Sequence, residues 1–283
     1  KTGFSLMKAE ILINTTKYQV DFSDPIDLSI PIFFNGDQPN TYGVEKASSV
    51  SYQDDAFVGD TRKGGPCNFE TYTITPHCNG THTECIGHIT EERISLHSSF
   101  NDIFSPSTLI TVQPVSHQET YFPKLQDGDL VITKEILENK LQEIAGDFLE
   151  GLIIRTLPNL KSKQSQDYMK NTPPFFTLEA MQYIRSRGVK HLLVDVPSVD
   201  RLFDDGHLSC HNIFWDTKNK KLNKHTSSYT ITEMIYVDDQ VSDGNYLLNI
   251  QVPSFVADAA PSRPIIFKLN EVELIAKKQT TNS

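Results

Sequence analysis

The sequence is poor in cysteine, in long apolar runs and in positive charge. Its 283 residues include only four cysteines, which are too few for a disulfide framework in a chain of this length, so we expect reduced thiols. No apolar run approaches the roughly 20 residues that span a bilayer. Lys1 to Phe22 also lack the apolar core of a secretory signal. We therefore expect a cytoplasmic protein without a membrane partner.

Charge and length narrow the class of protein further. The formal net charge is −10, which argues against nucleic acid as a partner, because that ligand needs a basic protein face. A chain of this length can bury its own core without a disulfide or a structural metal. Since no internal repeat divides it, we expect residues 1–283 to form a single domain.

Expected strands outnumber expected helices. Alternating or continuous apolar patterns predict strands over 11–18, 26–34, 71–75, 109–115, 129–133, 151–155, 191–196, 246–252 and 265–275. Helical spacing predicts helices over 134–145 and 178–187, the second with Thr177 as N-cap and Gly188 just past its end. This pattern indicates an α/β or α+β fold, with a mixed sheet and few helices.

The chemistry is expected in segment 77–88, which holds three of the nine histidines. His82 and Glu84 are two positions apart, so on extended backbone both side chains point to one side and can meet one metal ion. Imidazole and carboxylate suit Zn²⁺, or Mn²⁺ where fewer protein ligands bind. His88 follows as a candidate general base and acid beside a metal-activated water. The alternative is a group of solvent-exposed polar residues near one turn.

These residues match a family pattern. Gly80-Thr81-His82-x-Glu84-x-x-x-His88 resembles the His-x-Gly-Thr-His-x-Asp-x-x-x-His motif of the cyclase family of metal-dependent hydrolases, which includes bacterial kynurenine formamidases and isatin hydrolases. Further segments resemble that family along most of the chain, at 27–32, 175–180, 194–200, 211–214, 232–235 and 260–264.

The resemblance implies a swivelling β/β/α-like fold that binds one or two zinc ions, or manganese in place of zinc. It implies that His82 and Glu84 are ligands, that His88 is the catalytic base, and that His211 and Glu233 complete a second metal position or bind substrate. The implied reaction is hydrolysis of a small amide, such as N-formylkynurenine in tryptophan catabolism, by a homodimer or homotetramer.

Three features depart from the family pattern. Glu84 stands where the family usually has Asp. Ungapped alignment places Cys78 at the first ligand position and period-two spacing favours it, whereas His77 fits only if one residue bulges. Finally, His211 and Glu233 are further apart than in the family, so 216–228 is expected to be an inserted loop.

The sequence also offers residues for substrate contact and leaves two alternative functions open. Phe34, with Phe33 and Tyr42 nearby, is expected to line an aromatic pocket, and Thr81 is expected to contact ligand or substrate. Hydrolysis of another cyclic amide or a lactone is one alternative. A closed, non-catalytic metal site is the other, because structural zinc uses only protein ligands whereas catalytic zinc keeps an open position.

Overall fold

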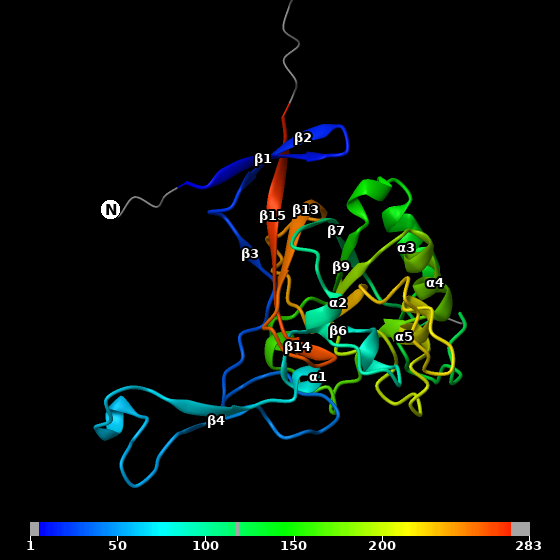
Figure 1. The fold of residues 1–283 in the computed structure, drawn as a ribbon. Helices are drawn as coiled ribbons and strands as arrows, with labels where there is room; N and C mark the ends of the chain where they lie inside the picture. The colour runs from blue at the N-terminus through cyan, green and yellow to red at the C-terminus, as the bar shows by residue number, and fades with distance from the viewer. Residues whose placement is uncertain (1–5, 117–118, 273–283) are drawn as a thin grey trace, which may run out of the picture.

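The computed structural model describes residues 6–116 and 119–272 (Figure 1). Its centre is an 11-stranded mixed sheet in the order β1-β2-β15-β13-β7-β9-β11-β12-β6-β14, with β3 paired to β15. Four central neighbours run parallel: β7 (Ser105–Val112), β9 (Gly151–Thr156), β11 (His191–Val194) and β12 (Thr230–Glu233). The predicted α/β class, with a mixed sheet and few helices, is confirmed.

Antiparallel strands extend this parallel centre on both sides. One side holds β13 (Gly244–Gln251), β15 (Arg263–Glu271), β3 (Ile26–Asp27), β2 (Thr16–Asp21) and β1 (Lys8–Ile13). The other side holds β6 (His82–Cys85) and β14 (Ala259–Pro261). The segment singled out by its histidines therefore contributes a strand between β12 and β14.

Helices and two small sheets surround the main sheet. The α-helices are α1 (Pro76–Asn79), α2 (Leu96–Ser99), α3 (Lys134–Leu141), α4 (Leu178–Ser186) and α5 (Ser209–Phe214). The 3₁₀ turns are η1 (Thr61–Lys63), η2 (Ile86–His88), η3 (Gly146–Phe148) and η4 (Lys161–Ser165). The two-stranded sheets are β4 (Ser48–Ser51) with β5 (Glu70–Thr73), and β8 (Val131–Ile132) with β10 (Phe175–Phe176). In Figure 1, α3 and α4 lie beside the parallel strands, and the β4 hairpin projects from the body.

The core explains why the central strands carry continuous apolar runs. Every residue of β9 and of β11 is buried, as expected for parallel strands covered on both faces. Helix α4 buries Ala180, Met181 and Ile184 in the same core. It begins at Thr177, whose hydroxyl accepts the Ala180 N–H at 3.1 Å, and Gly188 follows its end with φ +82°. Both predicted ends are confirmed.

Several predicted boundaries are wrong. Residues 11–18 form parts of two strands because the chain reverses between β1 and β2, with Asn14 at φ 49°. Only Ile26–Asp27 of 26–34 is strand, and the Asp27 carboxylate then accepts the Ser29 N–H at 2.9 Å, which turns the chain. The helix expected over 134–145 ends at Leu141. Positions 273–275 of the last predicted strand lie outside the described residues.

Among the residues that the structure describes, no helix is both long and apolar enough to cross a bilayer.

Candidate metal centre

Strand β6 places its ligand-type side chains on one face. Its register with β12 sets Glu233 directly opposite His82 and sets Thr232 opposite Thr83. The two threonine hydroxyls meet at 2.7 Å, so the alternate residues His82 and Glu84 face the other way. The prediction that these two side chains share a face is confirmed.

The two distant residues named by the resemblance reach this face. His211, on α5, places Nε2 3.1 Å from Glu84 Oε1 and 3.8 Å from Glu233 Oε1. Glu233 Oε2 lies 3.4 Å from His82 Nε2. The interval between His211 and Glu233 includes segment 216–228, which turns back through a bridge between Lys218 and Lys221. Both ends of this interval therefore lie at the site.

The choice between Cys78 and His77 depends on α1. The period-two argument for Cys78 is wrong, because Pro76–Asn79 is a helical turn and not extended backbone. His77 Nδ1 lies 3.2 Å from Glu84 Oε2, and His77, His82 and Glu84 form a group of donors within 4.8 Å of one another. Among the described residues, Cys78 belongs to none of the groups of side chains that could together hold a metal ion, which we call donor groups. Burial and the charge of Glu233 raise the pKa of its thiol to about 11, so the geometry favours His77.

Two buried atoms fit a metal ion. His82 is fully buried, and its Nδ1–H donates to the Gly80 carbonyl at 3.0 Å, which leaves the lone pair on Nε2. Within the described chain, neither His82 Nε2 nor Glu84 Oε2 has a hydrogen-bond partner. Buried polar atoms rarely remain without a partner, because the loss of hydration is costly. His82 and Glu84 offer an imidazole nitrogen and a carboxylate oxygen within 4.8 Å of one another, and these ligand types suit Zn²⁺ or Mn²⁺.

The charges of the site support this fit. Burial alone would raise the pKa of Glu84, but His88, His211 and His77 together hold it well below its usual range. Burial likewise opposes protonation of His77, yet Asp258 and Glu84 raise its pKa to about 10. Protons on imidazoles therefore balance the carboxylates where a divalent cation would otherwise do so.

Asp200 positions His211, and the sequence interpretation assigned it no role. Its Oδ2 lies 2.6 Å from His211 Nδ1, and its Oδ1 accepts the Cys210 N–H at 2.7 Å and the Tyr121 hydroxyl at 2.8 Å. With Nδ1–H bound to Asp200, His211 directs Nε2 toward Glu84. This is the carboxylate–histidine arrangement common behind metal ligands. The only signal was that Asp200 closes the family-like segment 194–200.

Asp258 is the second residue that sequence analysis missed. Its Oδ2 lies 3.0 Å from His77 Nε2 and 3.4 Å from His88 Nδ1. Hydrogen bonds from both imidazoles hold the pKa of its carboxyl far below the usual range. No local motif marks it, because its partners come from the other end of the chain.

His88 lies at the edge of the cluster and is partly open to solvent. It ends η2, its side chain is 28% exposed, and its Nε2 lies 3.7 Å from Glu84 Oε2. A half-buried imidazole next to the ligand cluster is open to solvent and to a reacting group. The arrangement is compatible with the predicted role as base.

Thr81 and Phe34, the two expected substrate contacts, lie in different surroundings. Thr81 is buried, and its hydroxyl accepts the Ile30 N–H at 2.9 Å and donates to the Met234 carbonyl. That placement favours a structural role for Thr81. The Phe34 ring packs on Tyr72 of the β4–β5 hairpin, with centroids 4.6 Å apart. Nearer the site, Tyr42 meets Phe203 edge to face at 6.1 Å, and burial and Glu233 raise the pKa of its hydroxyl.

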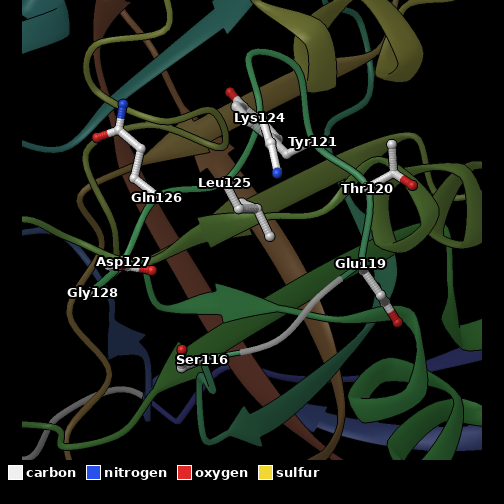
Figure 2. A pocket seen from close by; sticks show the side chains of 9 residues that line it. All are labelled: Ser116, Glu119, Thr120, Tyr121, Lys124, Leu125, Gln126, Asp127 and Gly128. Atoms are coloured by element: carbon white, nitrogen blue, oxygen red, sulfur yellow. The ribbon is translucent and has the colours of Figure 1, made fainter.

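A separate cavity of about 700 Å³ lies beside Tyr121. Figure 2 shows the residues that line it, among them Glu119, Tyr121 and Lys124. Its lining contains no member of the donor groups. Tyr121 links it to the candidate centre through Asp200, so we assign the chemistry to the histidine cluster and not to this cavity.

The chain is similar to known proteins in sequence and in fold. A family model described as "Putative cyclase" matches residues 20–201. A kynurenine formamidase of Bacillus cytotoxicus is 25% identical over 249 residues, which cover 87% of this chain and 96% of that protein. A structure described as a predicted metal-dependent hydrolase from Bacillus stearothermophilus superposes with a TM-score of 0.56 at 17% identity, covering 86% of this chain and 98% of the other. Isatin hydrolase A from Labrenzia aggregata superposes with a TM-score of 0.55 at 13% identity, covering 86% and 93%.

Proposed function

Because this chain belongs to the cyclase family, and its named relatives are hydrolases, we propose that it is a metal-dependent amidohydrolase of the kynurenine formamidase type. The observation that carries the proposal is the group of His77, His82 and Glu84, whose possible ligand atoms lie within 4.8 Å of one another. Within it, His82 Nε2 and Glu84 Oε2 are buried and make no hydrogen bond among the described residues. The proposed substrate is a small N-formyl aryl amine, with N-formylkynurenine as the first to test.

His77, His82 and Glu84 would hold the principal metal ion, and His211 with Glu233 would complete a second position. A bound zinc ion would lower the pKa of water and polarise the substrate carbonyl. Glu233 Oε1 accepts the Val199 N–H at 2.9 Å, and His211 is held by Asp200. These residues are therefore oriented before a metal binds, so little reordering is needed on loading.

His88 would move the protons. Its Nε2 faces Glu84, and its exposed edge is open to solvent. In amide hydrolysis, Nε2 would accept a proton from the attacking water and then deliver it to the leaving amine nitrogen. An aryl amine leaves more easily once it is protonated, so one residue can serve both steps.

The aromatic part of the substrate would lie against Tyr42 and Phe203. Both rings are substantially exposed, at 44% and 63%, and they meet edge to face. Large exposed aromatic side chains beside a polar cluster are suited to bind a flat ring, because ring burial contributes most of the contact area. We assign this role to the pair in preference to Phe34, which packs on Tyr72.

The test combines metal analysis with substrate profiling. Purified protein is assayed for bound zinc and manganese, and then for hydrolysis of formyl aryl amines, isatin-like lactams and simple lactones. We expect stoichiometric metal and the highest kcat/KM on a formyl aryl amine. In His88→Ala we expect kcat to fall about 10²–10⁴-fold with metal retained. Absence of bound metal after zinc loading would overturn the metal assignment, and a lactone preference would overturn the substrate class.

A further inference from the structure

One carboxylate oxygen meets two imidazoles from different elements. Asp258 Oδ2 lies 3.0 Å from Nε2 of His77 on α1 and 3.4 Å from Nδ1 of His88 on η2. The two rings lie side by side, with centroids 4.4 Å apart and an interplanar angle of 31°. Donors from both rings can therefore converge on the same acceptor.

This shared acceptor determines which nitrogen of each ring is left free. With Nε2–H of His77 directed at Asp258, Nδ1 faces Glu84 Oε2 at 3.2 Å. With Nδ1–H of His88 directed at Asp258, Nε2 faces the same Glu84 oxygen at 3.7 Å. The hydrogen bond made by one ring nitrogen sets the protonation of the other, so opposite nitrogens of the two rings point into the site.

The backbone holds Asp258 in place. Its carbonyl accepts the Cys85 N–H at 2.9 Å, and the next residue, Ala259, pairs with Glu84 across β14 and β6. Its neighbour Ala257 accepts the Leu96 N–H at 2.7 Å. The carboxylate is thus attached to the same sheet edge that carries Glu84, and its distance from the two histidines is set by strand pairing.

We propose that Asp258 is a positioning residue that fixes the ring orientation and tautomer of both the ligand His77 and the base His88. This role of Asp258 rests on the proposed function, because it acts through the proposed ligand and the proposed base. It also accounts for the unusual first ligand. His77 comes from a helical turn, one position before Cys78, and a carboxylate behind its ring directs Nδ1 at the site without extended backbone.

The test uses zinc-loaded protein, with Asp258→Asn, Asp258→Ala and Asp258→Glu compared with wild type. Asp102→Asn is the matched control, because Asp102 lies 3.1 Å from His191 Nε2 in an Asp–His pair outside the site. Nitrogen-15 NMR of the imidazoles reports the tautomers independently of turnover. Zinc content, thermal unfolding, kcat and KM are measured on each variant.

In Asp258→Ala we expect the His77 and His88 signals to lose their single-tautomer shifts, and kcat to fall about 10–100-fold with KM changed less than about twofold. Asp258→Asn keeps an acceptor of the same size but loses the charge, so we expect an intermediate loss. Asp258→Glu should recover part of it. Asp102→Asn should leave the site signals and kcat unchanged.

Two results would overturn the inference. Unchanged tautomers and kcat in folded Asp258→Ala would show that the carboxylate positions neither ring. Loss of one full zinc equivalent in Asp258→Asn would show that Asp258 is itself a ligand. If wild type hydrolyses no formyl aryl amine while the tautomers still depend on Asp258, the proposed function fails and the positioning role stands.

Discussion

Glu233 lies directly across from His82 in the register of β12 with β6, and its Oε2 is 3.4 Å from His82 Nε2. The other oxygen accepts the Val199 N–H. Glu233 therefore holds one oxygen for the protein backbone and turns the other toward the site. The pairing makes Glu233 part of the site through strand register, although the two residues are distant in sequence.

Glu233→Gln is expected to weaken zinc binding about 10–100-fold, because an amide oxygen carries no negative charge and binds zinc poorly. Zinc titration against a competing chelator measures the change. Thr232→Val is the control, since Thr232 faces the opposite side of the sheet, where its hydroxyl bonds that of Thr83. The control should lower stability and leave zinc affinity intact. Equal affinity in wild type and Glu233→Gln would contradict the assignment.

His77→Ala and Cys78→Ser separate the two candidate first ligands. We expect His77→Ala to lose most zinc affinity, because its Nδ1 lies 3.2 Å from Glu84 Oε2. Cys78→Ser should keep the affinity, because Cys78 belongs to none of the donor groups among the described residues. Zinc content after dialysis against a weak chelator measures both. The reverse pattern would restore the thiolate as ligand.

Local patterns predicted part of this molecule well. The ends of α4 followed from Thr177 and Gly188, and the shared face of His82 and Glu84 followed from the two-residue spacing. Both depend on neighbours in sequence. The His77–Asp258 contact joins residues 181 positions apart, so no local pattern could place it. The sequence left His77 and Cys78 both open as first ligand, and its period-two argument for Cys78 does not apply, because Pro76 begins a helical turn where extended backbone was expected.

Zinc binding should release protons. In the metal-free protein the pKa of His77 is raised to about 10, and Asp200 and Glu84 raise that of His211 despite its burial. Each imidazole must lose a proton before it binds zinc, so we expect about two protons released at pH 7. Calorimetry in two buffers of different ionisation enthalpy counts them. Release of none would contradict the raised pKa values.

The same shift sets how stability of the metal-free protein varies with pH. His77 gains its partners on folding, so its folded pKa, about 10, is above the ordinary value of 6.5. Its contribution is fully present below pH 6.5 and is lost progressively as pH rises toward 10. Urea unfolding of chelator-treated protein at several pH values should show this fall. The fall should be smaller in His77→Gln, and an identical profile in both proteins would contradict the prediction.

Tyr121→Phe tests the support behind His211. The Tyr121 hydroxyl donates to Asp200 Oδ1 at 2.8 Å and accepts the Arg201 N–H at 2.9 Å. Phenylalanine keeps the ring packed on Phe175 but leaves that buried N–H without its acceptor. We expect a loss of about 1–3 kcal/mol in the free energy of unfolding. Zinc affinity should fall less than in Asp200→Asn, because Asp200 keeps its bond to His211.

Lys163 and Asp195 form a buried pair whose disruption should lower stability more than any change discussed above. Lys163 Nζ donates to Asp195 Oδ2 at 2.7 Å, to the Thr156 carbonyl at 2.6 Å and to its hydroxyl at 2.9 Å, which uses all three of its protons. The Asp195 side chain is fully buried, whereas that of Lys163 is 12% exposed. Lys163→Met therefore leaves an uncompensated buried carboxylate, and we expect a loss of about 3–5 kcal/mol in the free energy of unfolding.

Lys163→Met combined with Asp195→Asn should recover part of this loss, because the remaining side chain carries no charge. Urea denaturation of the two variants measures both values, and a double variant no more stable than Lys163→Met would show that the buried charge is not the cause.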